Sequence, residues 1–358
     1  MTGAEPGATK DRADEAKGRR LLEAALVWDN HANLPIDYDA HERLIHRLGE
    51  FRTAGVDVVS LNVGYNKVPL ERQVRLLAQV RRWIKSHVDG YSLVETVADI
   101  RSAKASGRLA VTFDIEGMDV VEQDPSLLGL FYDLGVRWML IAYNTDNLAG
   151  GGCYGSGMGL TRFGRELLDE MAALGMVPCC SHTSERTAYD VLEHYAEPVI
   201  FSHSNPAALV PHPRNVPDDL IRRCAASGGV VGICGHSVFL GAPKPTATDV
   251  VRHIDYVVQL VGPDHVGISL DTALFDEAAK QREAELAPRT VPAEYAYTSA
   301  VTLGPEVYPA IADELVRAGY ADTEITKILG GNFLRVAEAV WKEPGARSGM
   351  PCSAGPEE

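Results

Sequence analysis

Five short apolar segments of this chain each end in side chains that bind metal ions or transfer protons. The segments cover residues 27–33, 111–116, 177–182, 199–203 and 266–271, and the side chains concerned are His31, Asn33, Glu116, His182, His203 and Asp271. An apolar run that stops at a histidine or a carboxylate is typical of a buried parallel strand whose carboxyl end carries chemistry. Five such ends in one chain predict a shared metal site.

The best ligand set among these residues suits zinc. Glu116, His182 and His203 offer one carboxylate and two imidazoles, a set that leaves a fourth zinc position open for water. Water bound to such a zinc has its pKa lowered from about 16 to about 7, which gives hydroxide at neutral pH. Asp114 shares a strand face with Glu116 and is a competing ligand.

Two further positions complete the predicted chemistry. Because strand side chains alternate, Asp29, His31 and Asn33 share one face, which places His31 as a ligand and Asn33 one pleat further out. Asp271 ends the last of the five segments. A carboxylate opposite the metal suits a general base that takes a proton from water and passes it to a leaving amine.

The elements that must position these residues alternate between short strands and helices. Eight β-branched runs lie near residues 26–33, 56–64, 109–117, 136–144, 176–183, 198–204, 229–235 and 265–273. Amphipathic segments between them include residues 70–88, 162–174, 184–194, 218–226 and 248–261. This alternation predicts an α/β fold, and eight units in 358 residues predict a single-domain (β/α)8 TIM-type barrel. A doubly wound nucleotide-binding fold is the alternative, but no Gly-x-Gly-x-x-Gly turn follows the first strand.

The composition along the chain predicts how this domain is bounded. We expect a disordered leader at residues 1–20, which are polar and charged, and a barrel domain at residues 21–344. Residues 345–358 are rich in Gly, Ser and Pro and are expected to form a flexible tail. Two inserted loops, at residues 148–159 and 274–303, follow strand ends, so they form lids, substrate walls or plain surface excursions.

Charge and cysteine content limit the partners and the compartment. The formal net charge of −15 argues against nucleic acids and anionic membranes as partners. The sequence has no run of about 18 apolar residues, so we expect no membrane-spanning helix. The six cysteines show neither a disulfide-type spacing nor a Cys-x-x-Cys pair, which favours the reducing cytoplasm.

Several longer motifs make the chain resemble one known family. The most specific are Pro198-Val-Ile-Phe-Ser-His-Ser204 and Arg214-Asn-Val-Pro-Asp-Asp219. Supporting motifs are Leu160-Thr-Arg-Phe-Gly164, His265-Val-Gly267 and Gly330-Gly-Asn-Phe-Leu-Arg335. Over residues 27–341 the chain resembles the membrane or renal dipeptidase family (peptidase family M19), a branch of the metal-dependent (β/α)8 hydrolases.

The resemblance implies a centre of two zinc ions. The first ion would be held by Glu116, His182 and His203. The second would be held by His31, the residue at position 33 and a bridging Glu116. The family has His-x-Asp where this chain has His31-Ala-Asn33, so the second site is expected to be weaker, because an amide oxygen is a neutral ligand. Asp29, on the same strand face, is a candidate source of part of the missing charge.

The resemblance also assigns residues around the metals. Arg214 would bind the carboxylate of the substrate, because a guanidinium pairs with a carboxylate through two hydrogen bonds. Asp271 would shuttle the proton. The family has a Thr-His-Asn triplet near the scissile carbonyl, where this chain has Ala142-Tyr143-Asn144. We therefore assign Tyr143 as a catalytic donor to the oxyanion and both Tyr143 and Asn144 to substrate binding.

Three hypotheses for the function follow. The first is a zinc-dependent dipeptidase with one or two zinc ions that hydrolyses dipeptides, including those with a D-residue at the carboxyl end. The second, motivated by Asn33 and Tyr143, is a relative with one metal or an altered metal that acts on another small amide or a biosynthetic intermediate. The third is a non-catalytic relative. For the two enzymes the expected partner is a small-molecule dipeptide or amide, and a homodimer is compatible with barrel hydrolases of this type.

Overall fold

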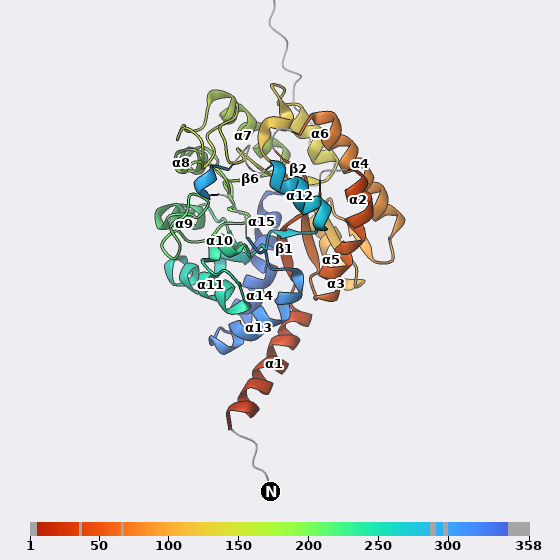
Figure 1. The fold of residues 1–358 in the computed structure, drawn as a ribbon, viewed down its shortest axis with the longest axis vertical. Helices are drawn as coiled ribbons and strands as arrows, with labels where there is room; N and C mark the ends of the chain where they lie inside the picture. The colour runs from red at the N-terminus through yellow and green to blue at the C-terminus, as the bar shows by residue number, and fades with distance from the viewer. Residues whose placement is uncertain (1–5, 36–37, 66–67, 287–290, 296–299, 343–358) are drawn as a thin grey trace, which may run out of the picture.

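The computed structural model describes residues 6–35, 38–65, 68–286, 291–295 and 300–342 of the chain (Figure 1). Its centre is a parallel sheet whose strands follow the order β6-β5-β4-β2-β1-β8-β7. These strands are β1 (Trp28–Asn33), β2 (Val58–Tyr65), β4 (Leu109–Glu116), β5 (Val136–Leu140), β6 (Val177–Cys179), β7 (Val231–Ile233) and β8 (Val266–Ile268). Two short strands, β3 (Tyr91–Leu93) and β9 (Thr272–Ala273), pair with β4 and β1.

Residues 198–204 close this sheet into a barrel. Ile200 forms a parallel bridge with Cys179 at the end of β6, and Phe201 forms one with Val231 of β7. The segment therefore lies between the two edges of the sheet, where the sixth barrel strand is predicted. The predicted α/β barrel of the TIM type is confirmed.

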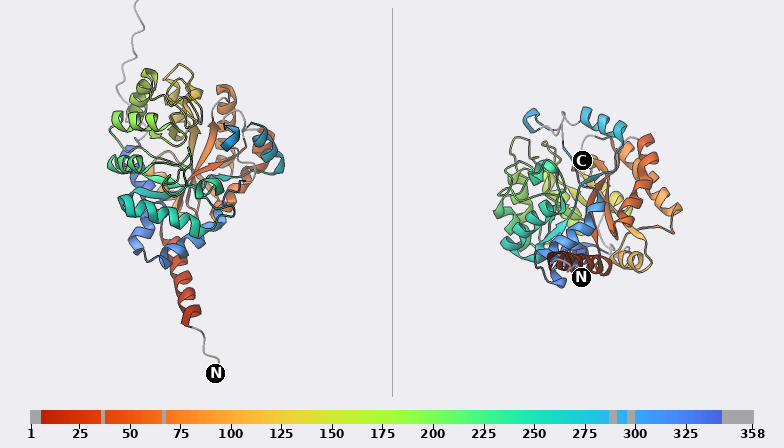
Figure 2. Two further views of the ribbon diagram at one scale, coloured as in Figure 1. Left: turned by 60° about the vertical axis from the view of Figure 1, so that its left-hand side comes forward. Right: turned by 60° about the horizontal axis from the view of Figure 1, so that its bottom comes forward.

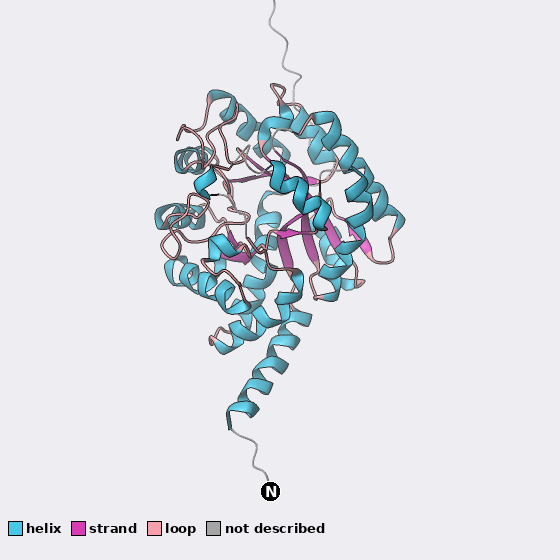
Figure 3. Ribbon diagram, in the orientation of Figure 1, coloured by secondary structure: helices cyan, strands magenta, loops and turns pink. Residues whose placement is uncertain are grey.

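Helices surround the strands, as the cyan and magenta ribbons of Figure 3 show. They are α1 (Pro6–Ala24), α2 (Tyr38–Leu44), α3 (Gly49–Thr53), α4 (Leu70–Ser86), α5 (Val97–Ala105), α6 (Leu127–Asp133), α7 (Arg162–Leu174), α8 (Glu185–His194), α9 (Asp218–Ala226), α10 (Ser237–Leu240), α11 (Ala247–Val261), α12 (Glu277–Leu286), α13 (Tyr308–Arg317), α14 (Asp322–Thr326) and α15 (Asn332–Val340). Among the described residues, no helix is both long and apolar enough to span a membrane.

Helix α7 illustrates why the sequence forms a helix at these places. The side chain of Thr161 accepts a hydrogen bond from the backbone N–H of Gly164, which satisfies one free donor of the first turn. The helix ends at Gly175, whose φ of 82° is the left-handed conformation that glycine adopts without strain. Between these ends, the apolar face is buried.

Helix α1 departs from the prediction for the leader. Residues 6–20, expected to be disordered, belong to this helix, which extends from the barrel in Figure 2. Its carboxyl-terminal half packs on α13, where a Cβ added to Gly18 would lie 2.1 Å from Oδ1 of Asp313. The segment is rich in Ala, Lys, Arg and Glu, which favour helix, and this close packing is what composition alone does not reveal.

Two other predicted segments are the inserted loop at residues 274–303 and the carboxyl-terminal tail. The inserted loop at residues 274–303 contains α12 and the single turn η5 (Ala293–Tyr295). Within it, residues 287–290 and 296–299 lie outside the described part of the chain, as does the predicted tail at 345–358.

Strand β4 shows how the barrel positions polar groups. All eight of its residues are buried, yet polar Thr112, Asp114 and Glu116 alternate with apolar Phe113 and Ile115. Because successive side chains of a strand point to opposite faces, the three polar residues share one face. In a barrel the residues of one face point to the axis, so this strand carries carboxylates into the barrel interior.

The motif Gly330-Gly-Asn-Phe-Leu-Arg335 joins the last helix to the base of the barrel. Asn332 donates from Nδ2 to the carbonyls of Pro263 and Val266 at 2.7 and 2.8 Å, next to the start of β8. A Cβ at Gly330 would lie 2.4 Å from the carbonyl oxygen of Leu26 and 2.7 Å from the backbone nitrogen of Trp28. The chain therefore needs a glycine here to approach β1, the strand that carries His31.

We expect Gly330→Ala to lower the free energy of unfolding by about 1–3 kcal/mol, because the added methyl group must displace the backbone of β1. The matched control is Gly129→Ala in α6, where the nearest atom would be 4.0 Å away. That variant should be neutral or slightly stabilised, since Ala favours helix over Gly by up to about 1 kcal/mol. Urea unfolding of both variants measures the difference, and equal midpoints would contradict the packing argument.

Candidate metal centre

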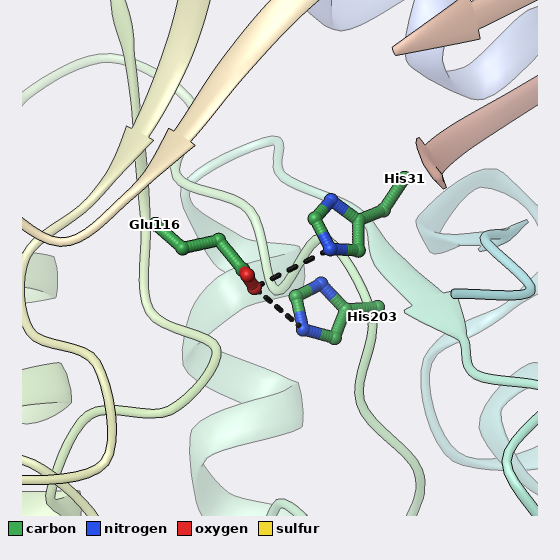
Figure 4. Close-up of side chains that lie close together, drawn as sticks. All are labelled: His31, Glu116 and His203. Carbon is green, nitrogen blue, oxygen red and sulfur yellow. Dashed lines mark ion pairs between the residues drawn. The ribbon is translucent and has the colours of Figure 1, made fainter. Parts of the chain in front are cut away.

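Three imidazoles converge on one carboxylate oxygen of Glu116. Its Oε1 lies 3.3 Å from Nε2 of His31 and 3.3 Å from Nε2 of His203 (Figure 4). It also lies 3.5 Å from Nε2 of His182. The Nε2 atoms of His182 and His203 are 2.9 Å apart, and all four side chains are buried. Four of the predicted ligands therefore meet at one point.

Each imidazole is held by a partner on its other ring nitrogen. The hydrogen-bond partners of Nδ1, with their distances, are Oδ2 of Asp114 for His31 (3.4 Å), Oδ1 of Asn144 for His182 (2.7 Å) and Oγ of Ser202 for His203 (2.8 Å). A carboxylate and an amide oxygen only accept hydrogen bonds. When neutral, the rings of His31 and His182 therefore carry their proton on Nδ1 and present a bare Nε2, the form that binds metal ions.

The charges around this point favour a cation. Burial lowers the pKa of His182 and His203 well below their usual range, so both rings are neutral at pH 7. Burial also acts to lower the pKa of His31, but the Asp114 and Glu116 carboxylates outweigh it and hold that pKa well above its usual range. A positive charge is therefore favoured here, either as a proton on His31 or as a metal ion.

Asp271 lies beside these ligands and is held by Asn33. Its Oδ1 accepts a hydrogen bond from Nδ2 of Asn33 at 2.7 Å and lies 3.6 Å from Nε2 of His31. Its Oδ2 accepts a longer contact from the thiol of Cys234, at 3.7 Å. Burial raises the pKa of Asp271 to about 6, so the carboxylate is ionised at neutral pH and remains basic enough to accept a proton.

The donor set fits one metal ion. His31, Glu116 and His203 each offer a ligand atom, and these atoms lie within 4.8 Å of one another. Imidazole nitrogens and a carboxylate oxygen are the donors that zinc takes in catalytic sites. Asn33 fits a ligand role less well, because its Nδ2 lies 3.3 Å from Nε2 of His31, and an amide nitrogen donates hydrogen bonds rather than coordinating.

The predicted substrate residues lie around His182. Tyr143 stacks on the His182 ring, with ring centroids 4.3 Å apart. Arg214 lines the same small cavity as His182 and donates from Nη2 to the carbonyl of His203 at 3.3 Å. Asn144 is buried, and its oxygen is the acceptor for Nδ1 of His182, so its side chain orients a predicted ligand.

Three residues of the centre adopt a left-handed backbone conformation. The φ angle is 62° at Asn144, 65° at His182 and 60° at Asp271. Each residue follows the end of its strand, and Asn, Asp and His tolerate this region better than other non-glycine residues. The reversal of φ turns each side chain away from the direction that strand alternation predicts.

Asp29 supports the backbone beside the centre. Its Oδ1 accepts from the backbone N–H of His31 at 3.4 Å and from that of Leu270 at 3.1 Å. Burial raises its pKa to about 7. The carboxyl group thus ties β1 to the residue before Asp271.

Sequence reasoning missed the residues that hold the ligands in place. Ser202 directly precedes His203, yet nothing in the sequence marks its hydroxyl as the partner of Nδ1. Cys234 lies within the seventh predicted strand, residues 229–235, and only the fold brings its thiol to Asp271. Asp114 was recognisable from its position on the strand face of Glu116, although the structure places it behind His31.

Known proteins resemble the chain in both sequence and structure. The family model described as membrane dipeptidase (peptidase family M19) matches residues 15–283. Dipeptidase verJ of Clonostachys rogersoniana is 32% identical over 260 residues, which cover 72% of this chain and 62% of that protein. The chain thus spans less than two thirds of the length of this curated relative.

Two further relatives are covered almost completely. An uncharacterized protein in the pqqA 5' region of Klebsiella pneumoniae is 31% identical over 287 residues, which cover 77% of this chain and 98% of that protein. The crystal structure of an amidohydrolase from Pseudomonas aeruginosa matches with a TM-score of 0.81 and 26% identity, over 91% of this chain and 99% of that one.

Asn144 offers a test of how the imidazoles are oriented. We expect Asn144→Gly to weaken zinc binding by about 10–100-fold, because His182 loses the acceptor that fixes its ring. Asn144→Asp retains an acceptor and should bind zinc at least as tightly as the natural protein. Gly and Asp both tolerate the left-handed backbone at this position, so backbone strain does not affect the comparison of the two variants. Competition with a chromophoric chelator gives the affinities, and equal values for the two variants would contradict the orienting role.

Proposed function

Because this chain belongs to the membrane dipeptidase family (peptidase family M19), we propose that it is a zinc-dependent dipeptidase that hydrolyses the peptide bond of dipeptides. The observation that carries the proposal is the convergence of three Nε2 atoms on Oε1 of Glu116, with Asp271 beside them. The proposed substrates include dipeptides with a D-residue at the carboxyl end.

Each step of the proposed reaction is assigned to particular residues of the chain. Glu116, His182 and His203 would hold a zinc ion, which when bound supplies an acidified water and a Lewis acid for the scissile carbonyl. Asp271, ionised at neutral pH, accepts the proton of the attacking water and passes it to the leaving amine. Tyr143, stacked on His182, is the proposed donor to the developing oxyanion. The resemblance assigns a second zinc to His31, Asn33 and Glu116, where the neutral amide weakens the site.

Aromatic and imidazole rings form a cluster that reaches Arg214, the proposed partner of the substrate carboxylate, through Phe239 and His212. They belong to Tyr154, His212, His236, Phe239 and Tyr295. The guanidinium lies 5.2 Å from the centroid of Phe239, and Tyr154 stacks on Tyr295 at 5.3 Å. Burial lowers the pKa of both His212 and His236 to about 4, so their rings are neutral at pH 7. The carboxyl-terminal side chain of a dipeptide held by Arg214 would therefore lie among uncharged rings.

A second candidate function keeps the fold and changes the substrate to another small amide. The observation that favours it is Tyr143, which stands where the family has a histidine. A phenol stacked on His182 offers a hydrogen bond with a different reach from an imidazole. Activity on a non-peptide amide together with inactivity on dipeptides would favour this candidate.

The cysteines support the proposed cytoplasmic location. The five described ones, Cys153, Cys179, Cys180, Cys224 and Cys234, are free thiols. Free thiols suit a reducing compartment.

The zinc-loaded protein is expected to hydrolyse members of a panel of L-L and L-D dipeptides, and a chelator should abolish this activity reversibly. Asp271→Asn should lower kcat/KM by about 100–10,000-fold, because the proton acceptor is lost. The matched control is Glu71→Gln on the exposed face of α4, which should leave kcat/KM unchanged. The rate of amine release gives kcat/KM for both variants. If the fully metallated protein cleaves no dipeptide of the panel, the proposed function is refuted.

The rings around Arg214 predict the preferred substrates. Dipeptides with Phe at the carboxyl end should have kcat/KM at least about tenfold above those with Gly, since burying a Phe side chain contributes roughly 1.5–3 kcal/mol. Tyr154→Ala should reduce this ratio, whereas Tyr189→Ala, on α8 beside Arg223, should not. The ratio follows from steady-state kinetics with the two substrates. An unchanged ratio in Tyr154→Ala would show that this ring does not contact the substrate.

A further inference from the structure

Asn33 occupies the position at which the family carries a metal-ligating carboxylate, and the structure uses it differently. We propose that Asn33 is a positioning residue for Asp271 and not a ligand, so that the centre of this chain takes one metal ion. The inference rests on the proposed metal centre but not on the proposed substrate.

The orientation of the Asn33 amide follows from its neighbour. Oδ1 of Asp271 lies 2.7 Å from Nδ2 of Asn33, and an ionised carboxylate only accepts hydrogen bonds. The opposite orientation would face the amide oxygen toward the carboxylate oxygen, two acceptors without a proton between them. The amide therefore turns its N–H groups toward Asp271, and these groups carry no lone pair for a metal ion.

The same nitrogen also occupies the approach to His31. It lies 3.3 Å from Nε2 of His31, the atom that points at Glu116. A second ion between His31 and position 33 would have to replace this N–H by a donor atom. The space in which the resemblance places a second zinc is thus lined by hydrogen-bond donors on its Asn33 side.

Asp271 is held on both of its oxygens. Asn33 donates to Oδ1, and the buried thiol of Cys234 contacts Oδ2 at 3.7 Å. A thiol is a weak donor, so the amide provides the stronger of the two contacts. Together they fix the carboxylate with Oδ1 3.6 Å from Nε2 of His31, at the edge of the ligand cluster.

Replacing Asn33 by Asp would reverse the electrostatics of this pair. Two carboxylates would then face each other at the present 2.7 Å contact, and like charges at that distance require a proton or a cation between them. In the natural protein the hydrogen bond removes that requirement. The choice between Asn and Asp at position 33 therefore decides whether a second cation is needed.

Metal stoichiometry tests this inference without using activity. The natural protein, saturated with zinc and freed of excess by gel filtration, is expected to retain one zinc per chain by mass spectrometry of the metal. Asn33→Asp is expected to retain two. Two zinc ions in the natural protein, or one in Asn33→Asp, would overturn the inference.

A second variant separates positioning from folding. Asn33→Ala is expected to retain one zinc per chain and to lower kcat by about tenfold at an unchanged KM, because Asp271 loses its main support while the ligands remain. Loss of the single zinc in this variant would show that Asn33 is a ligand and would overturn the inference. A natural protein with one zinc and no activity on dipeptides would refute the proposed function and leave this inference standing. Two zinc ions in a natural protein that hydrolyses dipeptides would overturn this inference and leave the proposed function standing.

Discussion

The centre depends on one requirement, which is that a buried carboxylate oxygen surrounded by three imidazole nitrogens needs a cation. Oε1 of Glu116 has three Nε2 atoms within 3.5 Å, and Asp114 adds a second carboxylate behind His31. Lone pairs at this density in a dry interior are unfavourable without a proton or a metal ion to share. The partners on each Nδ1 keep the rings turned inward, so the fold maintains this arrangement instead of relaxing it.

The sequence predicted the barrel and the meeting of the candidate ligands because both depend on local patterns. Apolar runs ending in His or Glu mark barrel strands, and the eight predicted strands correspond to seven strands and one bridging segment of the structure. His31, Glu116, His182 and His203 lie together because parallel strands end at the same rim of a barrel. Strand alternation also identified Asp114 as a neighbour of Glu116, since both stand on β4.

The remaining features depend on contacts between residues far apart in the chain. The link between Asn33 and Asp271 spans 238 positions, and that between Asn144 and His182 spans 38. The left-handed backbone at His182 and Asp271 changes the direction of their side chains, which the alternation of side chains along a strand does not predict. The sequence did not predict helix α1 because this helix also depends on a distant contact. Its partner α13 lies almost 300 residues later in the sequence.

The central claim is that the three imidazoles and Glu116 form a centre for a single metal ion, with Asn33 outside its ligand sphere. Anomalous diffraction at the zinc edge from crystals of the zinc-loaded protein tests it most directly. The account predicts one peak, at about 2.0–2.2 Å from the Glu116 carboxylate and from Nε2 of at least two of the three histidines. A second peak of comparable height coordinated by Asn33, or no peak at Glu116, would contradict it.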